Sequence, residues 1–447
     1  MSPALSMQPW DPAHPAVHLF DTNLGPHLFL VNGSEVYGLG AAEAAELRRA
    51  IAAEDPEEVL RVLRTFSLES LPLIDDTPVV SPPLRALSLA VAQTCNLGCT
   101  YCYAQQGHFG GSAIAMSADV ARAAVDYLLR DVPQGEQVNI AFMGGEPLAN
   151  RKVLRQTTEY AASRASERGI SIGFSITTNG TLLNEADGKF FEQHGFAVTI
   201  SLDGVGEVHD RLRPFKSGAG TFQRIIERTR PLLSMQHRMQ VSARVTVTPR
   251  NLCLLQTLQE LVDLGFHSVG FSPMLSAPSG RDAMGEAELA ILLERMIECG
   301  REWERQMAAG RRYPFANIVN ALKEIHRGTH RPYPCGAGAG YLGVSATGEL
   351  SACHRFVRDP TGAMGDLETG IDRVSQNNWL ADRHVHRQEP CRSCWARYLC
   401  GGGCHHEVIH RGRPACNYVR GWLHYCLGAY VRTLARQPKY FSGSQSA

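Results

Sequence analysis

Six apolar runs, each separated from the next by a helix-type pattern, constrain the fold of this chain most strongly. They lie between Leu84 and Met274 and are LRALSLAVA, VNIAFMGG, ISIGFSITTNG, FAVTISLDG, QVSARVTVT and HSVGFSPM. Runs of this kind are typical of buried parallel strands, which are joined by helical crossovers. One crossover pattern, SADVARAAVDYLLR, has Ser117 at its expected N-cap. The alternation predicts an α/β barrel or part-barrel with its chemistry at the carboxyl ends of the strands.

Different patterns flank this core. Residues 1–80 carry three strand patterns and then two helical ones, which predicts a small α+β domain that serves either as a peptide-docking unit or as a structural cap. The core is expected to span 84–310, with a long helical pattern around 286–309. A metal-stapled domain is expected over 311–432, because the chain there becomes rich in Gly, Cys, His and Arg and shows little periodicity. Residues 433–447 are expected to form a C-terminal tail.

The charge balance excludes several classes of partner. Lys and Arg together number 44, as do Asp and Glu, so no charge excess would recruit nucleic acid or an anionic membrane. No apolar stretch reaches the roughly 18 residues of a membrane span, and the first residues lack the pattern of a secretory signal. We therefore expect a soluble, cytoplasmic protein.

The 13 cysteines fall mainly into two groups, and metal ligation explains them better than disulfides do. Cys253 and Cys299 stand apart and are expected to be inert buried thiols. The first group, Cys95, Cys99 and Cys102, follows the first predicted strand. Three thiolates on a strand-to-helix loop suit a four-iron cluster, and one iron without a protein ligand is then open to a substrate or cofactor.

The spacing C-x3-C-x2-C, with Tyr101 directly before the last cysteine, resembles that of the radical S-adenosylmethionine (SAM) superfamily. GGEP, TTNG and SLDG at the ends of the next three predicted strands match as well. The resemblance implies a partial, TIM-like (βα)6 barrel, a SAM-binding [4Fe–4S] cluster on the cysteine triad, and SAM as cofactor. The SAM contacts that it implies are Gly144, Gly145, Glu146, Pro147, Thr177, Asn179, Ser201, Asp203 and Arg213. Structural roles fit Thr177, Asn179, Ser201 and Arg213 equally well.

The second group holds eight cysteines: Cys335, Cys353, Cys391, Cys394, Cys400, Cys404, Cys416 and Cys426. Their order resembles the SPASM extension of radical SAM peptide-modifying enzymes, which implies two auxiliary [4Fe–4S] clusters. One cluster would take Cys391, Cys394, Cys400 and Cys416; the other would take Cys335, Cys353 and Cys404, with Cys426 or an open position. Cys416 and Cys426 can be exchanged in this assignment. Structural zinc is the alternative, because CxxC pairs also fit zinc ribbons.

A narrower resemblance is carried by SCWARYLCGGGCHHEV and CNYVRGWLHYC, which are similar to the family of quinohemoprotein amine dehydrogenase maturation proteins. It implies an enzyme that forms thioether bonds from cysteine sulfur to Asp or Glu carbons in a small cysteine-containing partner protein or peptide. The chemistry implied is hydrogen abstraction by a 5′-deoxyadenosyl radical, with an electron donor as a second partner.

His354, next to Cys353, is the candidate catalytic base for a substrate thiol; a structural hydrogen bond near the cluster is the alternative. Sulfatase-maturing relatives carry Asp at the corresponding position, so His354 argues against formylglycine formation. Arg355 and Arg397 are candidates to bind a substrate carboxylate.

Two rival functions remain open at this point. One is a carbon–carbon or cyclophane link made by the same superfamily in a ribosomal peptide. The other is a zinc-stabilised peptide-binding scaffold without enzymatic activity.

Overall fold

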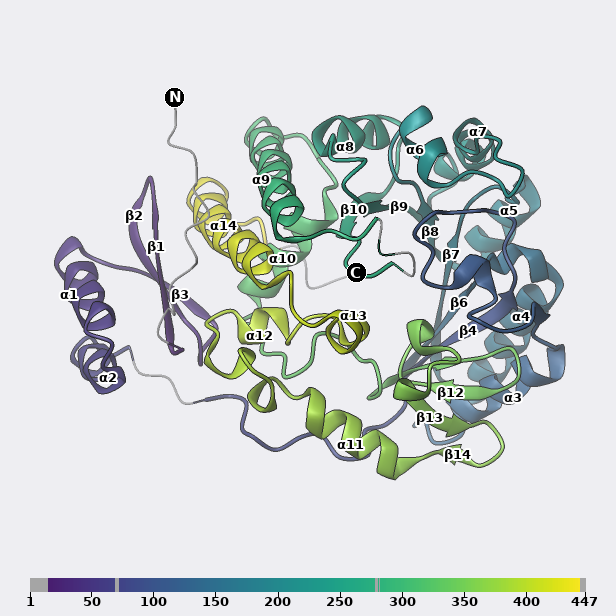
Figure 1. Ribbon diagram of the computed structural model, residues 1–447, viewed down its shortest axis with the longest axis horizontal. Coiled ribbons are helices and arrows are strands. Elements are labelled where there is room, and N and C mark those ends of the chain that lie inside the picture. The colour runs from purple at the N-terminus through teal and green to yellow at the C-terminus, as the bar shows by residue number, and fades with distance from the viewer. Residues whose placement is uncertain (1–14, 69–71, 278–279, 281, 443–447) are drawn as a thin grey trace. The chain divides into compact units, whose positions relative to one another are not determined.

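The computed structural model describes residues 15–68, 72–277, 280 and 282–442 (Figure 1). The chain divides into two compact units, and both are discontinuous in sequence. Unit 1 is formed by Met1–Pro78, Gly285–Cys335 and Ala381–Ala447, and unit 2 by Val79–Met284 and Gly336–Leu380. These units cross the domain boundaries predicted above. The first residues of the predicted N-terminal domain (1–14) and the last residues of the predicted tail (443–447) lie outside the described residues. The four-part domain division therefore stays a prediction.

Unit 2 is built on six parallel strands whose order in the sheet follows their order in the chain. They are β4 (Ala86–Gln93), β6 (Gln137–Gly144), β7 (Ser171–Thr178), β8 (Ala197–Ser201), β9 (Gln240–Val247) and β10 (Ser268–Pro273). Each coincides with one of the six apolar runs to within a few residues, so the predicted α/β fold is confirmed.

The crossovers between these strands contain helices that lie on the outer side of the sheet (Figure 1). They are α3 (Ala118–Leu129), α4 (Arg151–Glu167), α5 (Glu185–His194), α6 (Glu207–Leu212), α7 (Phe222–Leu233) and α8 (Leu254–Asp263). The Ser117 side chain accepts a hydrogen bond from the Val120 backbone N–H at 3.2 Å, which confirms the expected N-cap of α3.

Burial along the strands differs from the expectation that all six are buried throughout. β4 is buried along almost its whole length, but β7, β8 and β9 alternate between buried and partly exposed residues. Their buried face is mainly apolar, whereas the opposite face carries Ser, Thr, Gly and Arg side chains. Because side chains alternate along a strand, the sheet has one apolar, buried face and one polar, partly exposed face, and the polar face reaches the carboxyl ends of the strands.

The other edge of β4 pairs with a strand from far along the chain. β11 (Tyr341–Val344) runs parallel to β4, and it is followed by antiparallel β12 (Glu349–Ser351), β13 (Ala363–Asp366) and β14 (Gly370–Ile371). A short β5 (Ile114–Ala115) pairs with the end of β4. Among the described residues β10 pairs with β9 alone, so the barrel is open between β10 and β4, as a partial (βα)6 barrel requires.

Unit 1 contains an antiparallel sheet of β1 (Val17–Thr22), β2 (Gly25–Leu30) and β3 (Glu35–Gly38), followed by α1 (Ala41–Ala52) and α2 (Pro56–Thr65). The three strands and two helices predicted for this segment are confirmed. They share a core that includes Val17, Leu28, Leu30, Leu47, Val59 and Val62.

Three longer helices complete unit 1: α9 (Glu286–Ala308), α10 (Ala316–His326) and α14 (Cys416–Arg436). Shorter helices of unit 1 are α12 (Arg397–Cys400) and α13 (His405–Arg411), whereas α11 (Arg373–Arg383) begins in unit 2 and ends in unit 1. The 21-residue α14 corrects the expectation of little periodicity in the cysteine-rich region. Its buried residues recur at helical spacing through Tyr418, Trp422 and Cys426. No helix within the described ranges is long and apolar enough to cross a membrane.

Candidate functional site

The cysteine triad lies on the loop directly after β4 in unit 2. The pKa of Cys99 is raised to about 12. Burial is the largest cause, the Arg213 charge opposes the increase, and the thiolates of Cys102 and Cys95 add to it. Burial likewise raises the pKa of Cys95, whose charge interacts with Cys102. The three thiols are therefore close enough for each negative charge to destabilise the others. A positively charged metal centre would remove that repulsion, which fits iron–sulfur ligation.

Two glycines allow the end of β6 to approach this loop. The Gly145 backbone N–H donates to the Ala92 carbonyl at 2.8 Å. A Cβ atom on Gly145 would lie 2.3 Å from the Thr94 carbonyl oxygen, and one on Gly144 would lie 2.4 Å from that of Ala92. Gly144 also has a φ of +136°, which side chains disfavour. The glycines of the GGEP motif are thus required by packing within the protein itself.

Glu146 of the same motif is fully buried and joins the end of β6 to the end of β7. Its carboxylate accepts hydrogen bonds from the Thr178 hydroxyl (2.7 Å), the Asn179 N–H (2.8 Å) and the Leu148 N–H (3.0 Å). Burial raises the pKa of Glu146, and these hydrogen bonds oppose the shift. Pro147, the last residue of the motif, opens a 3₁₀ turn. The implied SAM contacts of Glu146 and Pro147 stay predictions.

Asn179 supports the triad loop directly. Its side-chain amide N–H donates to the Asn96 side-chain oxygen at 2.9 Å and lies 3.7 Å from the Cys95 sulfur. Its side-chain oxygen accepts hydrogen bonds from the Thr181 N–H and hydroxyl, at 2.9 and 2.7 Å. Asn179 therefore has a clear structural role at the triad, whichever contact it also makes to a ligand.

A buried charged network lies beside the triad. Asp203 is fully buried; it accepts a hydrogen bond from Tyr101 and lies 3.5 Å from Arg213, whose guanidinium also donates to the Tyr101 oxygen at 2.7 Å. The second carboxylate oxygen of Asp203 accepts the Thr246 N–H at 2.8 Å. Burial raises the pKa of Asp203, and the Arg213 charge lowers it. The network therefore ties the triad loop to the ends of β8 and β9.

Arg213 keeps one donor for a further group. Burial by itself lowers its pKa, but the charges of Cys99 and Asp203 raise it, so the guanidinium stays protonated. Its side chain is only 11% exposed, and its Nε–H has no hydrogen-bond partner among the described residues. An unpaired buried donor beside three thiols fits an anionic ligand, such as a carboxylate, at the triad.

The open polar face of the sheet continues from this network. Thr177 and Ser201 lie on it, near the ends of β7 and β8, and both are partly exposed. Ser201 is the register partner of Arg244 on β9, and Arg244 donates a hydrogen bond to the Ser272 hydroxyl. Across β6 to β10, all of whose residues are described, Arg244 is the one charged side chain on this face.

Sequence reasoning missed Arg244. In QVSARVTV the polar residues alternate with buried apolar ones, and Arg244 occupies a polar-face position. That alternation was the available signal, because a strand buried on both faces would not place an arginine there.

His354 lies in unit 2, directly after Cys353. Its Nδ1 is 2.8 Å from the Tyr341 hydroxyl, and its ring contacts Tyr103 edge-to-face at 6.2 Å. Burial, followed by the Arg355 charge, lowers the pKa of His354 to about 4. The imidazole is therefore neutral at pH 7, and its low pKa makes it a weaker base than an ordinary histidine. Its assignment as a catalytic base stays a prediction.

Tyr103 lies close to both Cys102 and Cys353 in unit 2. Burial raises the pKa of its hydroxyl, the Arg355 charge lowers it, and the Cys102 and Cys353 thiolates raise it further. The Arg355 guanidinium lies over the Tyr103 ring, 5.1 Å from its centre. Cys353 is thus placed near the triad by β11 and β12.

Four of the C-terminal cysteines come together in unit 1: Cys391, Cys394, Cys400 and Cys416. The pKa of Cys391 is raised to about 12. Burial is the largest cause, the Arg413 charge opposes the increase, and the neighbouring thiolates add to it, namely those of Cys400, Cys416 and Cys394. They follow the grouping that the SPASM resemblance implied.

Three consecutive glycines shape the backbone at Cys400. Gly401, Gly402 and Gly403 have φ values of +70°, +93° and +81°. This conformation turns the N–H groups of Gly402 and Gly403 toward the Cys400 sulfur, where they lower the pKa that burial raises. Such a run of N–H groups is suited to a thiolate or sulfide anion.

Cys426 lies elsewhere. It is fully buried in α14, and burial followed by the Glu304 charge raises its pKa well above the usual range. Of the two exchangeable candidates, the structure therefore brings Cys416, and not Cys426, to the Cys391 group. Cys335 and Cys404 belong to unit 1 and Cys353 to unit 2, so the second auxiliary set stays a prediction.

The isolated cysteines and the second candidate arginine are also placed by the structure. Cys299 is buried as expected, but Cys253 is exposed at the start of α8, which corrects the expectation of a buried thiol. Arg397 is buried; its guanidinium donates to the Pro15 carbonyl and, at 3.1 Å each, to the Cys394 carbonyl and the Asn32 side chain. Since these groups occupy its donors, Arg397 does not fit a substrate carboxylate.

Comparison with known proteins gives a consistent result. The family model of the radical SAM superfamily matches residues 89–249. A cysteine-type anaerobic sulfatase-maturating enzyme of Clostridium perfringens is 30% identical over 339 residues, covering 72% of this chain and 89% of that protein. A serine-type anaerobic sulfatase-maturating enzyme of Klebsiella aerogenes is 25% identical over 350 residues, covering 76% and 84%.

Solved structures agree on the fold. Native anSMEcpe with bound AdoMet matches with a TM-score of 0.65 at 20% identity, covering 79% of this chain and 99% of that one. The same protein with bound AdoMet and the Cp18Cys peptide matches with a TM-score of 0.63.

Proposed function

Because the chain belongs to the radical SAM superfamily, in the family of the anaerobic sulfatase-maturating enzymes, we propose that it modifies a peptide or small protein by radical chemistry. The specific reaction proposed is a thioether link from a substrate cysteine sulfur to a side-chain carbon of Asp or Glu. The observation that carries this choice is Arg244, the one charged side chain within the described strands β6 to β10. The cytoplasm is the proposed location.

The residues of the first site fit the cofactors that the family uses. Cys95, Cys99 and Cys102 would hold a [4Fe–4S] cluster, and the unpaired Nε–H of Arg213 would receive the SAM carboxylate. When bound, the cluster and SAM supply an adenosyl radical that removes a hydrogen atom, and auxiliary clusters supply an acceptor for the surplus electron. Cys391, Cys394, Cys400 and Cys416 would hold one auxiliary cluster.

Arg244 supplies the recognition that acidic side chains need. A guanidinium binds a carboxylate through two parallel hydrogen bonds, which fixes the orientation of the adjacent carbon. One partner of Arg244, the Ser272 hydroxyl, is a neutral group and can share the guanidinium with a substrate. Arg244 would therefore hold the carboxylate while the carbon beside it loses hydrogen.

The overall reaction removes one hydrogen pair from the substrate for each link. The carbon–hydrogen bond breaks and its hydrogen ends in 5′-deoxyadenosine, the thiol proton is released, and the sulfur–carbon bond forms. The substrate loses two electrons: one goes with the hydrogen atom to 5′-deoxyadenosine and one passes to the acceptor. The electron from the reductant is consumed when SAM is cleaved to methionine, so SAM is the net oxidant and the link is a two-electron oxidation. His354, which follows Cys353 in the chain and is hydrogen-bonded to Tyr341, is the candidate to accept the thiol proton.

A second candidate function is the oxidation of a Ser or Cys side chain to formylglycine in a sulfatase. The names of the relatives favour it. His354, where Asp is expected for that reaction, counts against it. Formylglycine formation also does not require an acidic substrate residue for Arg244 to bind.

The test is the mass of a small cysteine-containing partner after anaerobic incubation with reconstituted enzyme, SAM and a reductant, read before and after alkylation of free thiols. Loss of a hydrogen pair per link, with thiols that resist alkylation, supports the thioether. Lost hydrogen with every thiol still reactive favours a carbon–carbon link. A new aldehyde, detected with a hydrazine probe, favours formylglycine, and either result overturns the thioether proposal.

A further inference from the structure

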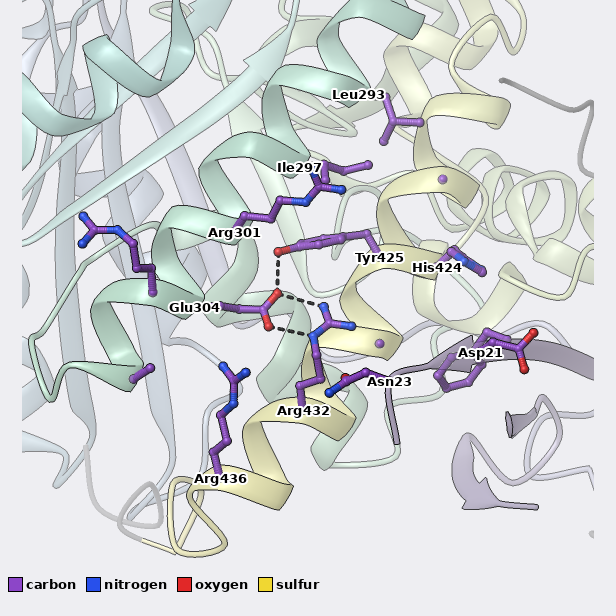
Figure 2. Close-up of a pocket in the computed structure, with 15 residues that line it drawn as sticks. Asp21, Asn23, Leu293, Ile297, Arg301, Glu304, His424, Tyr425, Arg432 and Arg436 are labelled. Atoms are coloured by element: carbon purple, nitrogen blue, oxygen red, sulfur yellow. Dashed lines mark hydrogen bonds and ion pairs between the residues drawn. The ribbon is translucent and has the colours of Figure 1, made fainter. Parts of the chain in front are cut away.

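Unit 1 contains a cavity of about 770 Å³ that includes no residue of the cysteine triad. It lies between the end of β1, α9 and α14, and Figure 2 shows its side chains. The volume is that of a site for a sizeable organic ligand, much larger than a single small anion needs.

The two helices that border the cavity touch closely at one end and are joined by paired side chains further along. A Cβ atom on Gly421 would lie only 2.4 Å from the Leu293 side chain, so the helices are in contact there. Further along, Glu304 of α9 bridges to α14: its carboxylate accepts the Tyr425 hydroxyl at 2.7 Å and two Arg432 N–H groups at 2.8 Å. These paired side chains, seen in Figure 2, form part of the cavity wall.

The walls combine an apolar floor with a cationic rim. Phe20, Leu293 and Ile297 are buried and contribute apolar surface. The charged lining residues are Asp21, Glu304, Arg301, Arg305, Arg432 and Arg436. Four positive charges thus face two negative ones, which favours a ligand with negative charge.

Internal ion pairs leave two of the guanidinium groups available. Asp21 pairs with Arg48 at 2.8 Å and Arg305 with Glu302 at 2.7 Å, while Arg432 is taken by Glu304. Arg301 forms no hydrogen bond or ion pair with any residue that the structure describes, and Arg436 interacts with Glu304 only through its charge. Figure 2 shows these two arginines on opposite sides of the Glu304–Arg432 pair.

We propose that this cavity binds a segment of the polypeptide substrate in which acidic and aliphatic residues are mixed, apart from the segment that is modified. The carboxylates would pair with Arg301 and Arg436, and the aliphatic side chains would cover Phe20, Leu293 and Ile297. The bidentate pairing of Glu304 with Arg432 shows that the cavity already accommodates this type of contact. The choice of a polypeptide rests on the proposed function.

The test uses the full-length, cluster-loaded protein without SAM or reductant, and a fluorescein-labelled peptide in which glutamates alternate with leucines. Fluorescence anisotropy is expected to show binding that weakens at least about tenfold in the Arg301→Glu/Arg436→Glu variant, because charge-assisted contacts become repulsive. Arg49→Glu is the matched control, since Arg49 is also exposed in unit 1 but does not line the cavity. Its affinity should equal that of the unchanged protein.

Two further peptides identify the occupant. Replacing glutamates by glutamines, or leucines by serines, should each weaken binding. Equal binding of the serine peptide would overturn the proposal in favour of a simple anion site, and equal affinities in the double variant and the control would overturn it outright. Competition by a free fatty acid but not by the unlabelled peptide would show a lipid site. Cross-linking activity plays no part in these readouts, so failure of this proposal and failure of the proposed function are separate results.

Discussion

The two cysteine sites are assembled in different ways. The triad is supported by residues from the ends of four strands, β6 to β9: Gly145 packs on the loop, Asn179 donates to it, and Asp203 links Tyr101 to Thr246 of β9. The four-cysteine site in unit 1 comes from one stretch of chain, between Cys391 and Cys416. The first site has three thiols and an unpaired arginine donor, whereas the second has four thiols and a turn of backbone N–H groups. The comparison indicates that the first site is open to a ligand and the second is closed.

The largest effect is expected at the triad. Cys99→Ala removes one of three ligands, so cleavage of SAM to 5′-deoxyadenosine should fall by at least about a thousandfold, as loss of an essential catalytic group does. The measurement is 5′-deoxyadenosine by liquid chromatography after anaerobic incubation. Cys253→Ala, an exposed cysteine at the start of α8, is the control and should keep full activity. Retained cleavage in Cys99→Ala would show that the triad is not the SAM site.

Replacing a ligand of the closed site should affect metal content more than SAM cleavage. Cys416→Ala is expected to lower the iron and sulfide content by one cluster while 5′-deoxyadenosine is still formed, because the triad is untouched. Cys426→Ala, from the same helix, tests the alternative assignment and should leave this cluster in place; Cys299→Ala, a buried cysteine outside both predicted sets, is the control and should keep the full iron content. The reverse pattern in an iron assay would exchange the two assignments.

The network beside the triad should contribute strongly to the stability of unit 2. Asp203→Asn leaves the Arg213 charge buried without its carboxylate partner, which typically costs about 3–5 kcal/mol. The free energy of unfolding, measured in urea under anaerobic conditions, should fall accordingly. Asp131→Asn, an exposed site, should change it by less than about 0.5 kcal/mol. Equal stability of the two variants would mean that the network is not needed for folding.

Arg244→Gln tests substrate recognition on the polar face. Loss of a charge-assisted contact should raise the KM for an acidic substrate by roughly 10- to 100-fold, because such contacts contribute about 1.5–3 kcal/mol. Cleavage of SAM without substrate should be unchanged. For a substrate with Gln in place of the acidic residue, the KM of the Arg244→Gln variant should be close to that of the unchanged protein. If the variant instead lost SAM cleavage, Arg244 would belong to the cofactor site.

The last prediction concerns the effect of pH on stability. His209 is fully buried; its Nδ1 accepts the Asp203 N–H at 3.2 Å, and its Nε2 lies 3.0 Å from the Thr221 hydroxyl. Burial and the Arg213 charge lower its pKa to about 3, from 6.5 in the unfolded chain. The unfolded state therefore binds the extra proton between these values, so stability should rise with pH across that window, at up to about 1.4 kcal/mol per pH unit. His209→Gln should flatten the slope in chemical denaturation at several pH values; an unchanged slope would contradict the assignment.

The sequence predicted what local pattern determines. The six strands, the N-cap at Ser117 and the three-strand N-terminal sheet are confirmed, because apolar periodicity and capping are properties of short segments. The grouping of Cys391, Cys394, Cys400 and Cys416 was implied by the resemblance to the SPASM extension, and the structure brings these four thiols together.

Features that depend on distant segments were not predicted. The β11–β4 pairing joins residues far apart in the chain, and α14 was hidden in a region identified by its cysteines. The Tyr101–Asp203–Arg213 network and the position of Arg244 also arise only when the strand ends meet. Arg397 looked like a substrate contact in the sequence, but its donors are used within unit 1.

The central claim is that the triad site is open to SAM and the four-cysteine site is closed. The most direct measurement is electron paramagnetic resonance of the reduced, cluster-loaded protein before and after addition of SAM, compared with the Cys99→Ala and Cys416→Ala variants. SAM should change the spectrum of the unchanged protein and of Cys416→Ala, and leave that of Cys99→Ala unaltered. A SAM-dependent change that persists in Cys99→Ala but disappears in Cys416→Ala would contradict this account.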